Sequence, residues 1–140
     1  MTRFVFIVAL YLSTVFIAQA QKTRELVLDA GVKPHAGIDE IYRNFSEAYR
    51  TLNSDLVAGL YTEGAAYLVP DQDVMTGRDN IGKSFRGFFE SVKGDGRNMT
   101  ISFRILQRNA EKQLGYDVGI YTLRIFKDGK EKSSGKGKFV

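Results

Sequence analysis

The spacing of the apolar residues changes from a helical period to a strand period along this chain of 140 residues. In the first part they recur at steps of three and four, which is typical of helices with one buried face. A good N-cap, Asn53 or Ser54, begins the second of these stretches, and Thr76 or Asp79 can cap the third. The pattern predicts helices over 38–52, 53–64 and 81–92.

Strands are predicted around and after the third helix. A short apolar run at 65–69 is stopped by Pro70, and 71–75 connects it to the third helix. Beyond Gly96 apolar and polar residues alternate, so one face of a strand is buried. A second long strand at 114–126 meets the hairpin signal Asp128-Gly129, and 131–140 returns as a third. Helices followed by antiparallel strands indicate an α+β fold.

The N-terminus is typical of a secretory signal peptide. Arg3 precedes a run without charged residues at 4–18, and Ala18-Gln19-Ala20 is a small-x-small cleavage site. The run is shorter than the roughly 20 residues that span a bilayer, so no stable membrane span is expected after cleavage. We therefore expect cleavage after Ala20 and a secreted or periplasmic protein. The weakly patterned segment 21–35 is interpreted as a lead-in to one domain at 36–140.

Composition excludes several kinds of chemistry. The chain has no cysteine, which removes disulfides, thiolate nucleophiles and cysteine-ligated metals. Its one histidine, His35, excludes multi-histidine centres and is expected at the surface, while Asp71 and Asp73 lack the spacing of a calcium loop. Five lysines at 127–138 are interpreted as a solvated hairpin, because no aromatic residues are interleaved to stack bases. We expect no metal, no cofactor and no nucleic acid partner.

One stretch, GRDNIGKS at 77–84, matches the phosphate-loop pattern at every fixed position. That motif needs a buried strand before its glycine-rich loop and a parallel sheet around it. Here an acidic connection precedes Gly77, and Lys83 and Ser84 fall inside a predicted helix. The match is therefore interpreted as accidental, and nucleotide binding is not expected.

The same region resembles a known family. The segments LYTEGA at 60–65, LVP at 68–70 and TGRDNI at 76–81, followed by Phe85, Phe88 and Phe89, are similar to the SnoaL-like branch of the nuclear transport factor 2-like superfamily. Downstream, 116–123 and 135–140 resemble the paired long strands of that family. The resemblance covers about residues 36–140 and keeps the order of the motifs.

This resemblance implies a cone, in which a curved antiparallel sheet wraps around the N-terminal helices and leaves an apolar pocket. It implies a small apolar molecule as the partner, and a homodimer through the sheet. The sequence departs from the family at its end, because the last strand, which often contains a tryptophan, is absent. Fold alone does not settle function.

Catalysis of the ketosteroid isomerase type is not expected. The resemblance places Val69 where that branch has its carboxylate base and Phe45 where it has its oxyanion-binding tyrosine, and neither residue can perform that chemistry. A shift of one helical turn would instead bring Tyr42 or Tyr49 near the pocket.

Four residues remain as candidates for lining the pocket: Tyr42, Tyr67, Asp117 and Tyr121. Asp117 and Tyr121 lie four apart on one face of a strand, with Gly119 leaving space between them. The alternative, which we favour for Asp117, is that it faces solvent or pairs with Arg104 across the sheet. The sequence predicts an exported small-molecule-binding domain. A lyase or isomerase acting on a small apolar substrate remains the alternative.

Overall fold

The structure is a computed structural model that describes residues 25–69 and 72–140. The predicted signal peptide at 1–20, with its cleavage site after Ala20, lies outside the described residues, as do Pro70 and Asp71. These expectations therefore stay predictions.

The three predicted helices are present as α1 (Ala36–Thr51), α2 (Ser54–Ala58) and α3 (Arg78–Gly94). Helix α2 is shorter than predicted, because it ends at Ala58 and not at Gly64. Side chains cap the first two: His35 accepts a hydrogen bond from the Ile38 amide, and Asn53 accepts one from the Leu56 amide. The predicted cap of α3 was wrong. Gly77 occupies the N-cap with φ 86° and provides no side-chain hydrogen bond.

Four strands form the main sheet in the order β1-β4-β5-β6. The long strands β4 (Arg97–Ala110), β5 (Gly115–Lys127) and β6 (Lys130–Phe139) are antiparallel, as predicted. The strand β1 (Leu26–Leu28), which lies in the segment interpreted as a lead-in, pairs in parallel with β4. The sequence analysis missed it because three residues are too few to show a period.

The predicted strand at 65–69 is shorter than expected. Only Ala66–Tyr67 forms β2, and it pairs with β3 (Met75–Thr76), which lies where only a connection and the start of a helix were expected. The predicted hairpin between β5 and β6 is confirmed, because Asp128 and Gly129 both have positive φ, at 53° and 71°.

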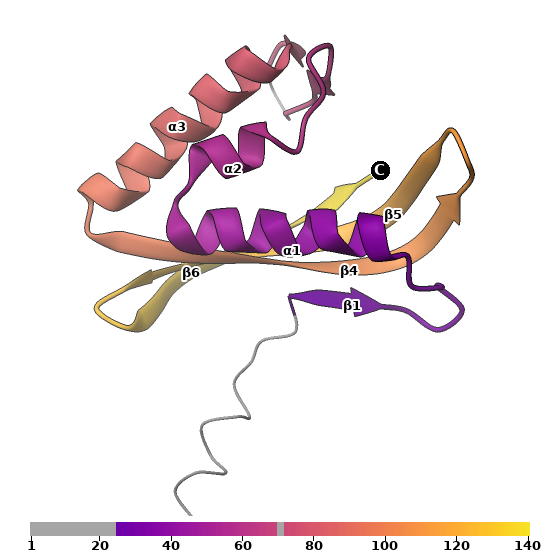
Figure 1. Cartoon of the computed structure of the whole chain (residues 1–140). Coiled ribbons are helices and arrows are strands. Elements are labelled where there is room, and N and C mark those ends of the chain that lie inside the picture. Colours follow the sequence, from indigo (N-terminus) through magenta and orange to yellow (C-terminus); the bar gives the residue numbers. More distant parts are fainter. Residues whose placement is uncertain (1–24, 70–71) are drawn as a thin grey trace, which may run out of the picture.

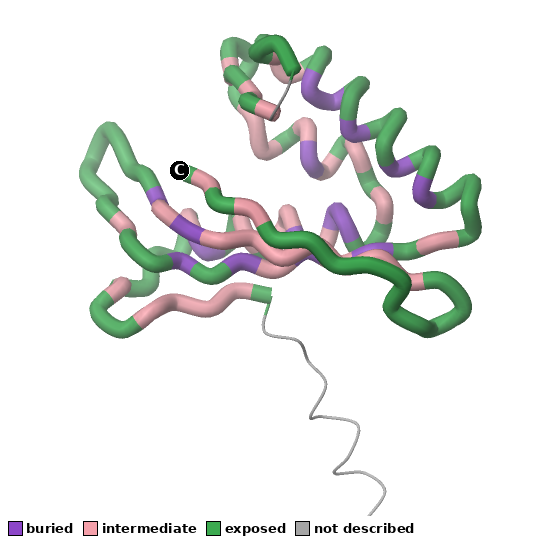
Figure 2. Tube along the Cα trace, turned by 180° about the vertical axis from the view of Figure 1, so that it is seen from behind, coloured by how far each residue is buried: buried purple, intermediate pink, exposed green. Residues whose placement is uncertain are grey.

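All three helices lie on one face of the curved sheet (Figure 1). Helix α1 runs along β4, and α2 and α3 pack on each other beyond it. Buried positions gather where the helices face the sheet, whereas the hairpin between β5 and β6 is exposed (Figure 2). The buried hydrophobic side chains are Ala48, Tyr49, Val57, Ile81, Phe85, Phe89, Val92, Met99, Ile101, Phe103 and Ile105.

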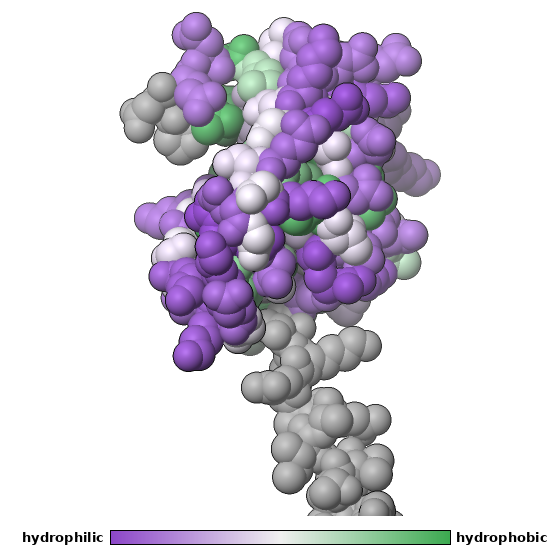
Figure 3. Space-filling view, turned by 90° about the vertical axis from the view of Figure 1, so that its left-hand side faces the viewer, coloured by the Kyte–Doolittle hydropathy of each residue, from purple (hydrophilic) through white to green (hydrophobic). Residues whose placement is uncertain are grey.

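On the face of the molecule drawn in Figure 3, hydrophilic side chains cover most of the surface, and hydrophobic ones show between them near the middle. None of the helices in the described residues is long and apolar enough to cross a membrane.

The phosphate-loop match lies in α3, as expected. Lys83 and Ser84 are exposed in the second turn of this helix, next to the buried residues Gly82 and Phe85. The strand before the motif, β3, is two residues long and antiparallel to β2. The phosphate-binding geometry of a parallel strand, loop and helix is therefore not formed by these residues.

Candidate functional site

The predicted alternation along β5 is confirmed at the three residues that the sequence analysis singled out. Asp117, Gly119 and Tyr121 lie on the face of β5 that is turned toward the helices, as the core contacts of Tyr121 show. Asp117 is 6% exposed, so it does not face solvent. The expectation that Asp117 faces solvent was therefore wrong.

The partner predicted for Asp117 was also wrong. Arg104 pairs instead with Asp29, and Asp117 pairs with Arg108, which lies directly opposite it on β4. Arg108 reaches the inner face because the register of β4 shifts between Ile105 and Gln107. Strict alternation from the buried Ile105 would turn residue 108 outward. The extra residue of the bulge reverses that parity.

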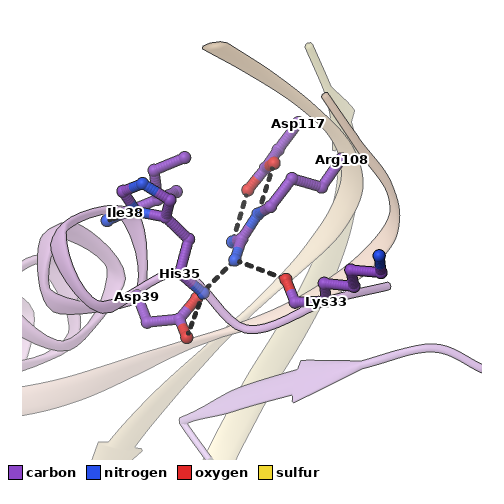
Figure 4. Close-up of polar contacts among 6 residues, drawn as sticks. All are labelled: Lys33, His35, Ile38, Asp39, Arg108 and Asp117. Atoms are coloured by element: carbon purple, nitrogen blue, oxygen red, sulfur yellow. Dashed lines mark hydrogen bonds and ion pairs between the residues drawn. The ribbon is translucent and has the colours of Figure 1, made fainter. Parts of the chain in front are cut away.

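Arg108 lies at the centre of a cluster that joins three segments of the chain (Figure 4). It donates two hydrogen bonds of 2.8 Å to the Asp117 carboxylate and one of 2.6 Å to Asp39 on α1. A fourth, of 3.3 Å, reaches the carbonyl of Lys33 before α1. The Arg108 side chain is 3% exposed, and those of Asp117 and Asp39 are 3% and 11% exposed.

Two carboxylates share this single guanidinium, so the cluster has one negative charge more than positive. The start of α1 offsets it, because Asp39 lies in the first turn, where the helix dipole favours an anion, and accepts a hydrogen bond from the His35 amide. The hydrogen bonds with Asp117 raise the pKa of Arg108 above its ordinary value despite burial. The arginine therefore stays charged at any pH at which the protein is folded.

Tyr42 extends the cluster into the interior. Burial, followed by its hydrogen bond to Asp117, raises the pKa of the Tyr42 phenol. Its ring packs on Phe103 at 4.9 Å between centroids and on Phe139 at 5.9 Å. Asp117 thus receives two hydrogen bonds from Arg108 and influences the nearby Tyr42 phenol, and its pairing with Arg108 orients the carboxylate within the protein instead of leaving it free to take a proton from a substrate.

The interior between the helices and the sheet is aromatic. Phe45 of α1 contacts Tyr61, Phe85 and Phe103 at centroid distances of 6.0–6.3 Å. Tyr61 packs on Tyr67 at 6.0 Å, and Tyr67 packs on Phe85 at 5.5 Å. These rings connect the helices with β2 and β4 in one continuous cluster.

Four tyrosines, Tyr49, Tyr61, Tyr67 and Tyr121, belong to this interior or pack against it. Burial, then the nearby phenols of Tyr67, Tyr61 and Tyr121, raises the pKa of Tyr49. Burial, then Tyr121, also raises the pKa of Tyr67. Among the described residues, the buried side-chain polar atoms that lack a hydrogen-bond partner are Ser46 Oγ and Arg97 Nε.

The structure divides the four predicted pocket residues between two places. Asp117 belongs to the charged cluster, with Tyr42 beside it, whereas Tyr67 and Tyr121 pack against the hydrophobic core. The sequence analysis missed Asp39 and Arg108, because only the bulge brings Arg108 inward. Phe45 is part of the aromatic cluster, Val69 is half-buried after β2, and His35 is exposed as expected but also caps α1.

Neither a family model nor a curated protein matches the sequence. Solved structures are similar to it. A "putative calcium/calmodulin dependent protein kinase II association domain" from Xanthomonas campestris is 22% identical over 83% of this chain and 79% of that one, with a TM-score of 0.58. A protein from Catenulispora acidiphila in complex with S-DNPA is 14% identical over 74% and 76%, with a TM-score of 0.59.

A domain of unknown function with a cystatin-like fold from Nostoc punctiforme is 16% identical over 71% of this chain and 59% of that one, with a TM-score of 0.54. At these identities the similarity establishes the fold. The predicted α+β architecture, with the helices on one face of a curved, unclosed sheet, is confirmed.

Proposed function

We propose that this chain, with its nuclear transport factor 2-like cone, is an exported domain that binds a small apolar molecule inside the cone. The observation that carries the proposal is the aromatic interior between the helices and the sheet, against which Tyr61, Tyr67 and Tyr121 pack and in which Tyr49 is buried. Apolar walls with a few converging polar groups are typical of small-molecule sites.

The charged cluster favours binding over catalysis. A lyase or isomerase needs a carboxylate that is free to accept a proton from the substrate. Asp39 and Asp117, the buried carboxylates of the described residues, are both engaged by Arg108. If either carboxylate moved away from Arg108 to act as a base, its buried negative charge would have no counter-charge, which is costly. We therefore favour a binding domain over the enzyme alternative.

A comparison supports a ligand role for this fold. The similar structure from Catenulispora acidiphila is in complex with S-DNPA. The polar groups available to a ligand here are phenols, which donate or accept one hydrogen bond each at neutral pH. An apolar molecule with one or two polar atoms matches this set of groups.

Native mass spectrometry of protein purified without denaturant tests the proposal. We expect a fraction of the protein to retain a small-molecule mass, and this fraction to fall in a Tyr61→Phe, Tyr67→Phe double variant. Tyr116→Phe is the matched control, because Tyr116 is 41% exposed on the outer face of β5. A ligand-free spectrum, combined with no binding from a library of small apolar compounds, would reject the proposal.

Export has its own test. Expression in a host with a secretion pathway should give a mature chain that begins at Gln21, which intact mass measurement would detect. An uncleaved chain retained inside the cell would contradict this part of the proposal.

A homodimer through the sheet is the proposed assembly. Val118 and Ile120 point away from the helices and are half-buried, and Leu106 beside them is 42% exposed. Light scattering coupled to size-exclusion chromatography should give twice the chain mass. An Ile120→Lys variant should give the mass of one chain, and a wild-type monomer would contradict the assembly.

A further inference from the structure

We propose that the edge of β6 that is unpaired within the described residues binds an extended segment of another protein, which adds to the sheet as a further strand. The segment that fits has acidic side chains on its outer face and large apolar side chains on the face toward the helices. This surface, the β6 edge, is separate from the interior proposed for a small molecule.

The strand β6 lies at one end of the main sheet. The order β1-β4-β5-β6 pairs it on one side only, with β5. Within the described residues its backbone makes no hydrogen bond to any other segment, and most of its ten residues are exposed (Figure 2). In an antiparallel edge strand, alternate residues point their N–H and C=O groups away from the sheet. This row of groups is a template for a further strand.

The inner face of β6 consists largely of small residues. The register with β5 places Ser133, Gly135 and Gly137 opposite residues that pack against the core. A Cβ atom at Gly135 would meet no other atom within 4 Å, although Leu123 lies directly opposite it. A large apolar side chain from a strand beside β6 would therefore have room over Gly135.

Two contacts on the same strands show how an aromatic ring covers a glycine. The ring of Tyr121 occupies the place of a Cβ atom at Gly137, and the ring of Phe139 does the same at Gly119. In each case the ring comes from the residue directly opposite on the neighbouring strand. Such pairing stabilises strands that contain glycine. Gly135 has no covering atom in the described structure, and the added segment would provide a ring there.

The outer face of β6 is basic. Lys136 and Lys138 lie opposite outward residues of β5, are exposed and make no ion pair among the described residues. Glu131, the acidic residue of the strand, pairs with Arg124 of β5. Cross-strand pairs of opposite charge stabilise a sheet, and pairs of like charge destabilise it. Acidic side chains beside these two lysines are therefore the complementary choice.

A second copy of β6 does not match this edge. In the antiparallel register that would place Phe139 of one copy beside Gly135 of the other, Lys136 would lie opposite Lys138 in both directions. Like charges directly opposite each other are destabilising. Lysines on an edge strand thus discourage pairing between copies and leave the edge to a segment of opposite charge.

Peptides matched in length to β6 test this complementarity. The acidic peptide alternates glutamate with phenylalanine, the basic peptide alternates lysine with phenylalanine, and the serine peptide alternates glutamate with serine. Fluorescence anisotropy would measure their binding, at concentrations where light scattering detects no peptide assembly. The wild type should bind the acidic peptide at least about tenfold more tightly than either control, because only this peptide matches both faces. Added salt should weaken that binding.

Charge reversal on β6 should reverse the preference. A Lys136→Glu, Lys138→Glu double variant should bind the acidic peptide about fivefold or more weakly than the wild type, and the basic peptide more tightly. The matched control is Lys83→Glu, Lys93→Glu, which makes the same change of net charge at exposed positions of α3. It should bind the acidic peptide nearly as the wild type does. Circular dichroism would confirm that both variants are folded.

Hydrogen exchange followed by nuclear magnetic resonance locates the bound peptide. The β6 amides that point away from β5 should become protected when the acidic peptide binds. Binding without that protection would overturn the proposal, as would equal affinities of the wild type for the acidic and basic peptides. Protection of these amides without peptide, rising with protein concentration, would show a second copy at the edge and would also overturn it. None of these results depends on a retained small molecule.

Discussion

Arg108 and Asp117 face each other across β4 and β5, and Nε and Nη2 of the arginine donate to the two carboxylate oxygens at 2.8 Å each. Both side chains are 3% exposed. Asp39 on α1 accepts from the remaining terminal nitrogen, so the pair also holds the start of α1 against the inner face of the sheet.

Arg108→Met should destabilise the protein strongly. The variant leaves two buried carboxylates without a counter-charge, and breaking a buried ion pair by removing one partner costs about 3–5 kcal/mol. For a domain of this size we expect the midpoint of thermal unfolding to fall by at least about 10 °C. Differential scanning calorimetry would measure it.

Arg104→Met is the matched control, since it removes an arginine from the same strand. Its partner is Asp29, and the Arg104 side chain is 60% exposed. Pairs of this kind contribute little, so the midpoint should change only slightly. Equal losses in the two variants would mean that the cluster around Arg108 has no special role in stability.

The position of Arg108 shows where sequence reasoning stops. Alternation correctly predicts that Met99, Ile101, Phe103 and Ile105 face the core. It assigns residue 108 to the outer face, and a β-bulge after Ile105 reverses this assignment. Bulges have no apolar pattern of their own, so the pairing of Arg108 with Asp117 could not be read from the chain.

The long elements could be predicted because their sequence patterns are local and regular. Helices α1 and α3 have several turns of regular apolar spacing, and the turn at Asp128-Gly129 depends on two adjacent residues that tolerate positive φ. The two-residue strands β2 and β3 depend on tertiary pairing, which a local pattern does not contain. Tyr42 and Asp117 were foreseen as site residues, but their contact requires packing of α1 on the sheet.

A second prediction concerns the tyrosines at high pH. Burial is the main cause that raises the pKa values of Tyr42, Tyr49, Tyr61 and Tyr67 above the ordinary value of about 10. In the folded protein these phenols should therefore ionise later than in the denatured chain. Absorbance titration near 295 nm, with and without denaturant, would measure the difference.

The same shifts fix the sign of the pH dependence of stability. Between pH 10 and the folded pKa values, the unfolded chain has lost phenolic protons that the folded protein keeps. The free energy of unfolding therefore falls as the pH rises above about 10, and the stabilisation is fully present below that value. Native titration of all tyrosines near pH 10, without unfolding, would show that these rings are not buried.

A third prediction concerns Gly119. A Cβ there would lie 2.7 Å from the backbone oxygen of Arg104 and 2.5 Å from the Phe139 ring. The backbone oxygen cannot move without disturbing the pairing of β4 and β5. Gly119→Ala should therefore cost about 1–3 kcal/mol in chemical denaturation. Gly135→Ala, on the neighbouring strand with no atom near its Cβ position, should cost clearly less.

The last prediction explains the glycine in the apparent phosphate loop. Gly82 is buried where α3 meets α2, and a Cβ there would lie 3.1 Å from the Cβ of Ala58. Gly87, five residues later in the same helix, is exposed and has nothing within 4 Å of its Cβ position. Gly87→Ala should stabilise the protein by about 0.5–1 kcal/mol, because alanine is the better helix former.

Gly82→Ala should stabilise the protein less than Gly87→Ala does, or destabilise it. Both variants gain helix propensity, but at residue 82 the added methyl group crowds α2. Urea unfolding of the two variants measures the difference directly. Lys83→Ala, at an exposed position, should leave stability nearly unchanged. If Gly82→Ala were as stabilising as Gly87→Ala, close packing of the two helices would not explain the glycine. A role in holding a phosphate would then need a direct test by titration with ATP.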